Sequence, residues 1–264
     1  MSQIEIKQLT KIFDTVSGKL KVVDNVSFNV AEGEFVCLLG PSGSGKSVTL
    51  NCIAGLLDIT SGDIKVDGVS VRERKPNYGY IFQQSRMLPW RTVRENLLFA
   101  LRAESGRAVP NEDQRIKDVL ELVNLVGYED FYMHQISGGM QNRVGIARAY
   151  VRKPDLLLMD EPFGALDEMA ARHLRSELVA TWMRDRRTVV FVTHDIVEAC
   201  YLADRIVIYT PKPTQIAAVI EIDLPHPRVY GSAALHEIES RVLAVFEKSL
   251  SDFANATDMA GTSL

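Results

Sequence analysis

The sequence has little cysteine, no long apolar run and no excess of positive charge. Its three cysteines among 264 residues, Cys37, Cys52 and Cys200, lack disulfide or metal-site spacing, which favours a reducing, intracellular compartment. The first residues, MSQIEIKQLTKIF, contain no apolar segment of the signal-peptide type. No stretch reaches the roughly 20 apolar residues that a membrane-spanning helix needs. Any role at a membrane is therefore expected to depend on a partner chain.

The charged residues do not indicate a nucleic-acid partner. Lysine and arginine total 30, aspartate and glutamate total 34, and the formal net charge is −4. Because there is no general basic field to attract a phosphate backbone, we expect no nucleic acid among the partners. The composition, with 46% hydrophobic and 24% charged residues, is that of a soluble globular chain. Its length suffices for one large domain or two small ones.

Short apolar segments recur along the chain and alternate with helical patterns. The segments EFVCLLG, YGYIF, DLLLMD, TVVFVTH and RIVIY are apolar throughout, as strands buried on both faces of a parallel sheet are. Between them lie amphipathic stretches, such as the one that places Leu174, Leu178 and Trp182 on one helix face. This order predicts an α/β fold with a mostly parallel central sheet. The segments IEIKQLTKIF, NVSFNV and GDIKVDG predict shorter antiparallel strands beside it.

We expect one domain over residues 1–250, with a helical subdomain inserted at about residues 91–153. That segment contains VRENLLFALRAES, QRIKDVLELVNLV and GMQNRVGIARAYV, and it has no obvious central strand. A last amphipathic helix is predicted from the apolar residues Leu235, Ile238, Val242, Val245 and Phe246. The polar residues 251–264 are expected to form a disordered tail.

The segment GPSGSGKS fits the pattern G-x-x-x-x-G-K-[ST] of a phosphate-binding loop. Glycines at Gly40, Gly43 and Gly45 let backbone N–H groups turn inward around phosphates. Lys46 adds a full positive charge near the β- and γ-phosphates, and Ser47 offers a hydroxyl to Mg²⁺. A glycine-rich turn that only happens to contain Lys-Ser is the alternative, but the strand before and the helix after disfavour it. The other residues expected to line this loop are Pro41, Ser42, Ser44 and Val48.

A pair of carboxylates ends the apolar strand in LLLMDEP. Such a strand would bring Asp160 to the carboxyl edge of the sheet, beside the phosphate loop, where it could hold Mg²⁺. Glu161 could then take a proton from the attacking water as a general base. Alone, these acids would also fit a solvated strand end. Together with the phosphate loop they predict a nucleoside-triphosphate hydrolase.

The segment ISGGMQNRV predicts a second anion site. Ser137, Gly138 and Gly139 open a helix, so a hydroxyl and backbone N–H groups gather at a helix N-terminus. A plain helix cap is the alternative. A chain with one phosphate loop has no obvious need for a second γ-phosphate site, whereas a symmetric head-to-tail dimer does, because each copy would close over the nucleotide of the other.

In order, the chain presents the phosphate loop, YIFQQ, ISGGMQNRV, LLLMDEP, FGALD and VTHD. This set resembles the ATP-binding subunit of an ATP-binding-cassette (ABC) transporter, from about Ile4 to Leu250. Ile136 and Asn142 stand where the family more often has Leu and Gln. The resemblance implies an ATPase that uses ATP and Mg²⁺ at a homodimer interface. It also implies that the signature residues that reach the nucleotide are Ser137, Gly138, Gly139 and Gln141.

Further roles follow only from this resemblance. Gln83 matches the Q-loop glutamine, which senses Mg²⁺ and the attacking water, and Gln84 is the neighbouring alternative. Asp167 matches the D-loop at the dimer interface, and His194 matches the switch histidine that contacts the γ-phosphate. Phe13 matches the aromatic residue that stacks on adenine, or it is a core aromatic of a short strand. The catalytic residues implied are Glu161, His194 and Lys46, and the metal ligands are Ser47, Gln83 and Asp160.

Within the family, MLPWRTVRENL, EPFGALDEM, LADRIVIYTPKPTQI and IDLPHPR resemble importers of the nitrate, sulfonate and taurine group. That resemblance implies a transmembrane permease as partner, a separate solute-binding protein, and a peripheral place on the cytoplasmic face of the cell membrane. An exporter subunit is one alternative. A non-transport ABC ATPase is another, although the short segment between Ser47 and Ser137 leaves no room for the coiled coil of chromosome-type members.

Val48 departs from the family, in which a hydroxyl residue more often follows the Lys-Ser pair and contacts the α-phosphate. The backbone N–H of Val48 remains available at the helix N-terminus. Thr49 lies about 100° further round the helix, so its hydroxyl is not expected to replace the missing one. We interpret Val48 as a change that tunes nucleotide affinity without destroying the site.

Overall fold

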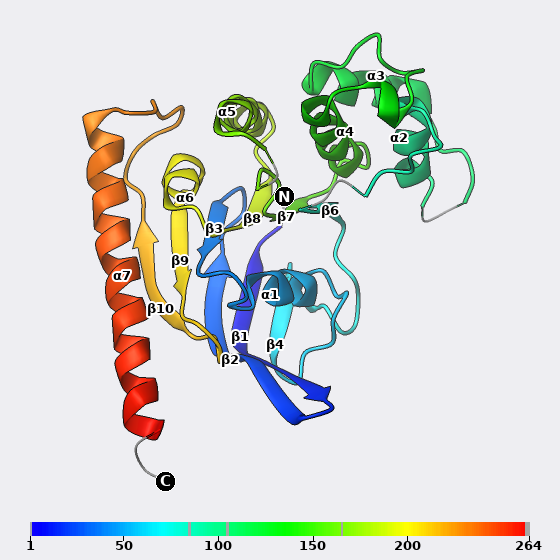
Figure 1. Cartoon of the computed structure of the whole chain (residues 1–264). Helices are drawn as coiled ribbons and strands as arrows, with labels where there is room; N and C mark the ends of the chain where they lie inside the picture. The colour runs from blue at the N-terminus through cyan, green and yellow to red at the C-terminus, as the bar shows by residue number, and fades with distance from the viewer. Residues whose placement is uncertain (1, 84–85, 104–105, 165, 262–264) are drawn as a thin grey trace. The chain divides into compact units, whose positions relative to one another are not determined.

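The computed structural model describes residues 2–83, 86–103, 106–164 and 166–261 (Figure 1). The chain forms two compact units. The first contains residues 1–76 and 188–264, and the second contains residues 77–187. The second unit includes the helix-rich segment expected at residues 91–153. It spans more of the chain than that segment, because two strands and a further helix also belong to it.

An antiparallel sheet forms one layer of the first unit, with the strand order β2-β1-β4-β5. Hydrophobic alternation fixes its register: Ile4 and Ile6 are buried while Glu5 between them is exposed, and Ile4 lies opposite both Val30 and Val66. The first two strands, of 12 and 13 residues, are longer than the short strands expected. The strands are β1 (Ile4–Thr15), β2 (Gly18–Val30), β4 (Ser61–Val66) and β5 (Val69–Ser70).

The second sheet of this unit runs in the order β10-β9-β3-β8. Strand β3 pairs in parallel with β8 and with β9, as the continuous apolar runs predicted. Strand β10 is antiparallel to β9 and was not among the predicted strands. Its residues alternate in burial, as those of an antiparallel edge strand do. The strands are β3 (Phe35–Leu39), β8 (Thr188–Thr193), β9 (Arg205–Tyr209) and β10 (Ile216–Glu221).

Three helices belong to the first unit, namely α1 (Lys46–Ile53), α6 (Ile196–Leu202) and α7 (Ala233–Gly261). Helix α7, orange to red in Figure 1, lies beside β10 and contacts α6. It extends to Gly261, so the expectation of a disordered tail from residue 251 is wrong for residues 251–261. The physical reason is that Phe253 continues the spacing of Val245 and Ser249, and all three line one groove along the helix.

In the second unit, helices join the parallel strands β6 (Tyr78–Ile81) and β7 (Leu156–Asp160), and a further helix follows β7. Side chains cap the starts of several of these helices. Thr92 and Glu95 form a capping box, and the Asp167 carboxylate accepts from the N–H of Ala170 at 3.0 Å. Trp182 is fully buried and its indole N–H donates to the Arg187 carbonyl at 2.8 Å. The helices are α2 (Val93–Leu101), α3 (Glu112–Leu122), the short 3₁₀ helix Met133–Gln135, α4 (Gly138–Tyr150) and α5 (Glu168–Arg184).

Within the described residues, none of the helices combines the length and apolar content needed to cross a membrane.

Arg228 closes the C-terminal end of α6. The side chain is 5% exposed, and burial lowers its pKa to about 10. Its guanidinium donates to the carbonyls of Cys200 and Ala203 at 2.7 Å, of Leu224 at 2.9 Å and of Tyr201 at 3.3 Å. A cation at this position satisfies carbonyls that the helix leaves unpaired and complements the helix dipole.

We expect Arg228→Met to lower the free energy of unfolding by about 3 kcal/mol, because buried carbonyls then lose a charged donor. Urea unfolding of the full chain measures this loss. Arg241→Met is the matched control, since Arg241 donates to one backbone carbonyl, that of Glu221, at 2.7 Å in an exposed position. An Arg228→Met chain as stable as the control would contradict the role assigned to Arg228.

Candidate functional site

The phosphate-loop segment follows β3 directly, and two of its glycines, Gly40 and Gly45, have little room for a side chain. A Cβ on Gly40 would lie 2.9 Å from Ser44 Oγ and 3.0 Å from Tyr209 Cβ. Gly45 has a φ of +93° and begins α1, and a Cβ there would lie 3.0 Å from Val22 Cγ1. The backbone therefore takes a path that only glycine allows at these two points.

Lys46 lies at the start of α1 with 3% of its surface exposed. Its ammonium donates to the carbonyls of Gly40 at 2.7 Å and Pro41 at 2.9 Å. A buried ammonium needs such partners, because an unpaired charge would be costly to remove from water. Gly45 supplies no side-chain acceptor to the first turn of α1. The loop therefore combines a held positive charge with an uncapped helix N-terminus, which suits an anion such as a phosphate chain.

The loop is supported by residues that the sequence did not reveal. The Thr214 hydroxyl donates to the Ser44 carbonyl, and the Thr214 N–H donates to the Val22 carbonyl at 2.9 Å. Ser44 Oγ is itself buried with no hydrogen-bond partner among the described residues. Thr214 follows the loop by about 170 residues, so no local sequence signal pointed to it.

Val48 and Thr49 have different surroundings at the start of α1. Val48 is half-buried, whereas Thr49 is fully buried and its hydroxyl accepts from the Tyr209 hydroxyl at 3.3 Å. The Thr49 hydroxyl is thus engaged by Tyr209, and the expectation that it does not replace the hydroxyl missing at Val48 stays a prediction. Burial strongly raises the pKa of Tyr209, so this phenol stays protonated and able to donate.

His194 and the phosphate loop directly follow two neighbouring strands, so both lie at the same edge of the sheet. Leu39, the last residue of β3, pairs with Thr193, the last residue of β8, in parallel register. Gly40 and His194 are the next residues of each strand, and His194 is exposed. The carboxyl ends of parallel strands are where α/β folds place ligand-binding residues.

Phe13 lies in β1, half-buried and opposite Leu20 of β2. The ammonium of Lys11 lies 4.8 Å from the centre of its ring, a cation–π contact. The ring therefore lies near the surface of the antiparallel sheet and outside the core. This placement is compatible with a stacking role, which stays a prediction.

In the second unit, the two parallel strands β6 and β7 bring Gln83 and Glu161 together. Ile81 pairs with Met159, and the chain then continues into Gln83 on one side and Asp160 and Glu161 on the other. The Gln83 amide Nε2 donates to Glu161 Oε2 at 3.3 Å. Glu161 has a φ of +44°, a backbone conformation that non-glycine residues adopt rarely and that is concentrated at functional sites. Asp160 is half-buried at the end of β7.

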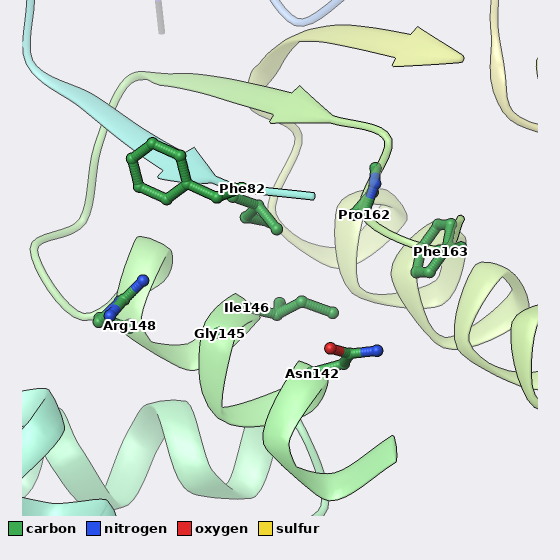
Figure 2. A pocket seen from close by; sticks show the side chains of 8 residues that line it. Phe82, Asn142, Gly145, Ile146, Arg148, Pro162 and Phe163 are labelled. Carbon is green, nitrogen blue, oxygen red and sulfur yellow. The ribbon is translucent and has the colours of Figure 1, made fainter. Parts of the chain in front are cut away.

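A small pocket lies next to this pair (Figure 2). It is lined by the end of β6, by α4 and by the residues that follow Glu161. Its lining residues are Ile81, Phe82, Asn142, Gly145, Ile146, Arg148, Pro162 and Phe163. Burial, assisted by the Asp160 carboxylate, strongly raises the pKa of the neighbouring Tyr80, which keeps that phenol neutral.

The signature residues open α4, as the sequence predicted. The Ser137 hydroxyl accepts from the Met140 N–H at 3.3 Å, and Ser137 and Gly138 are exposed. Gln141 donates from its amide to the Met133 carbonyl at 2.9 Å, so it holds the preceding 3₁₀ turn. Asp167 is exposed at the start of α5. The alternative glutamine, Gln84, lies outside the described residues.

The residues present fit a nucleotide and a magnesium ion in different ways. The glycine-lined loop and the buried Lys46 ammonium suit the phosphates. Among the described residues, no cluster of three or more His, Cys, Asp or Glu side chains could hold a metal ion by itself. That finding is compatible with Mg²⁺, which is usually held by one or two carboxylates together with substrate phosphates.

Known proteins resemble this chain over most of its length. The ABC transporter family matches residues 23–164. The aliphatic sulfonates import ATP-binding protein SsuB of a Bacillus cereus strain is 43% identical over 244 residues, covering 92% of this chain and 96% of the relative. The protein of that name from Bacillus subtilis (strain 168) is 40% identical over 246 residues, covering 93% and 94%.

A solved dimeric structure of MJ0796, described as a bacterial ABC transporter cassette, has a TM-score of 0.73 and 32% identity, covering 84% of this chain and 100% of that one. A second structure of MJ0796, in a post-hydrolysis state bound to ADP and Pi, has a TM-score of 0.72 and 31% identity with the same coverage. The predicted α/β fold class of an ABC ATPase is thereby confirmed. The chain belongs to the ABC transporter family and is one of its ATP-binding cassettes.

Proposed function

We propose that this chain is the ATP-hydrolysing subunit of an importer that takes up aliphatic sulfonates or a closely related anion. The Lys46 ammonium, buried at a glycine-lined helix start, is the observation that carries nucleotide binding. The sulfonate-import relatives, at 40–43% identity over more than nine-tenths of the chain, favour import over export. The net charge of −4 disfavours the alternative of a nucleic-acid-associated ABC ATPase.

Each unit contributes its own residues to hydrolysis. The first binds the phosphates through the N–H groups of the loop and Lys46, and His194 is proposed to contact the γ-phosphate. When bound, Mg²⁺ would offset the charge of the β- and γ-phosphates, with Ser47, Asp160 and Gln83 as its proposed protein ligands. Glu161 accepts a proton from the attacking water, and the Gln83 amide orients the Glu161 carboxylate for that transfer.

The two glycines after Ser137 support a head-to-tail homodimer. Apart from the neighbouring backbone of α4 itself, a Cβ on Gly138 or Gly139 would meet no atom of the described residues within 4 Å. Alanine is favoured over glycine in a helix by about 1 kcal/mol, so helix stability does not explain why two glycines stand here. They do suit the close approach of another molecule's phosphates. We propose that this molecule is the ATP bound by the other copy.

An exposed aromatic surface of the second unit is proposed to receive the permease. It consists of Trp90, Tyr128, Phe131 and Tyr132, with Trp90 70% exposed. The Val93 N–H donates to the Phe131 carbonyl at 2.9 Å, so the segment after Trp90 lies beside the other three residues. Exposed aromatics in one area mark protein interfaces. This partner would place the subunit at the cytoplasmic face of the cell membrane, with a solute-binding protein acting through the permease.

We expect Glu161→Gln to bind ATP with the parental affinity but to lower kcat by about 10²- to 10⁴-fold, because the general base is lost. ATP titration and single-turnover hydrolysis measure the two effects. Glu121→Gln removes an exposed carboxylate that pairs with Lys117 at 3.9 Å and should change neither value. Parental turnover by Glu161→Gln would show that Glu161 is not the base.

Val48→Thr should tighten ATP binding by roughly two- to tenfold, the effect of one added hydrogen bond to a phosphate. Equilibrium titration with ATP measures the change. Thr49→Val is the control, because its hydroxyl contacts Tyr209, so its removal should affect stability more than affinity. Equal affinity in Val48→Thr and the parent would mean that the hydroxyl has no role at this position.

Affinity capture of the tagged chain from its native membranes should recover a polytopic permease, and the complex should hydrolyse ATP faster when binding protein and an aliphatic sulfonate are supplied. Trp90→Ala should reduce permease recovery by about 30-fold, as loss of a central aromatic anchor does. Val229→Ala, 68% exposed in the first unit, should retain it. Recovery with ribosomes or DNA and without a permease would contradict the transport function.

A further inference from the structure

The main chain at Arg86 and Leu88 is held by side chains from two helices of the second unit. Arg148 of α4 donates from Nη1 to the Arg86 carbonyl at 2.6 Å. Asn96 of α2 accepts from the Leu88 N–H at 2.9 Å and donates to the Leu88 carbonyl at 3.2 Å. Arg86 and Leu88 are therefore attached to α4 and α2 through their backbone groups.

Arg86 also reaches back to the residue before Gln83. Its guanidinium lies 4.9 Å from the centre of the Phe82 ring, and that ring stacks on Tyr80 with centres 4.3 Å apart. Arg148 holds the backbone carbonyl of Arg86, and the side chain of Arg86 contacts the Phe82 ring. These contacts link the position of Phe82 to Arg148. Phe82 and Arg148 both line the pocket of Figure 2.

Arg148 is less accessible to water than a surface arginine. It is half-buried, and desolvation lowers its pKa. Among the described residues, no carboxylate lies within ion-pair distance of it, so the Arg86 carbonyl is the hydrogen-bond acceptor that compensates for its burial. A long apolar residue would fill this space more cheaply, which indicates that the hydrogen bond to the main chain beyond Gln83 is what requires arginine here.

Gln83 is sensitive to small displacements. Its Nε2 lies 3.3 Å from Glu161 Oε2, slightly beyond the usual range for an N–H···O hydrogen bond. A further shift of a few tenths of an ångström in the backbone next to Phe82 would break the contact. Anchors on this segment therefore decide whether Gln83 reaches the proposed base.

We propose that Arg148 is a positioning residue for Gln83, and that it acts through the Arg86 backbone and the Phe82 ring. This inference rests on the proposed function, because it assumes that Glu161 is the base of ATP hydrolysis. It gives α4 two roles, since the helix begins at the signature residue Ser137 and carries Arg148 near its other end.

The test is a comparison of Arg148→Met, Arg148→Lys and the parent in steady-state ATP hydrolysis by the full chain. Arg148→Met should lower kcat by about 10- to 100-fold, because misplacing a catalytic arrangement by about 1 Å costs that much. The KM for ATP should stay within about twofold, since the phosphate loop belongs to the other unit. Arg148→Lys keeps one donor and should recover most of the lost kcat.

Arg94→Met is the matched control, because Arg94 forms an exposed ion pair with Asp113 in the same unit, and parental kcat is expected. Thermal unfolding of every variant distinguishes a positioning role from a folding role. If Arg148 had only a structural role, Arg148→Met would lower activity and the unfolding temperature together. Arg148→Lys would then not restore kcat without also restoring the unfolding temperature. If the parent hydrolyses ATP and Arg148→Met has the parental kcat, the inference is overturned and the proposed function is unaffected. A parent without hydrolysis would overturn the proposed function, and this inference with it.

Discussion

The burial of one ammonium group, that of Lys46, constrains the loop between β3 and α1. Its hydrogen bonds to the Gly40 and Pro41 carbonyls require a tight loop, and the loop requires glycine where Cβ atoms would meet Tyr209 and Val22. Tyr209, the last residue of the neighbouring strand β9, and Thr214, in the turn after it, then hold α1 and the loop in place. The loop and its supporting contacts thus form a geometry that suits phosphates, and donors held in place by the fold need no reorganisation during a reaction.

The second unit depends on a different constraint, the parallel register of β6 and β7. Because Ile81 lies opposite Met159, the residues that leave the two strands meet at one edge, and Gln83 there contacts Glu161. Helix α4 lies next to that edge through Arg148 and begins with the signature turn at Ser137. If a second copy's ATP binds Ser137, as we propose, one rigid helix joins that contact to the residues around Glu161.

Local patterns predicted the parts of the protein that depend on neighbouring residues. The apolar strands, the phosphate loop and the helix start at Ser137 all have signals within a few residues, and the structure confirms the strands and the helix start. The contacts of Thr214, Tyr209 and Arg148 join residues 62 to 170 positions apart and have no such signal. Strand β10 was missed although its residues IAAVIE are mostly apolar, and the end of α7 was missed because the residues after Leu250 are mostly polar or small.

The central claim is that each ATP is shared between the phosphate loop of one copy and the signature turn of another. Complementation tests it directly: a Lys46→Ala chain and a Ser137→Arg chain, each inactive alone, are mixed and assayed for ATP hydrolysis. The mixed dimer contains one site with both parts intact, so the mixture should hydrolyse ATP faster than either variant. A Ser137→Arg chain that retains the parental rate, or a mixture no faster than its better component, would contradict the shared site.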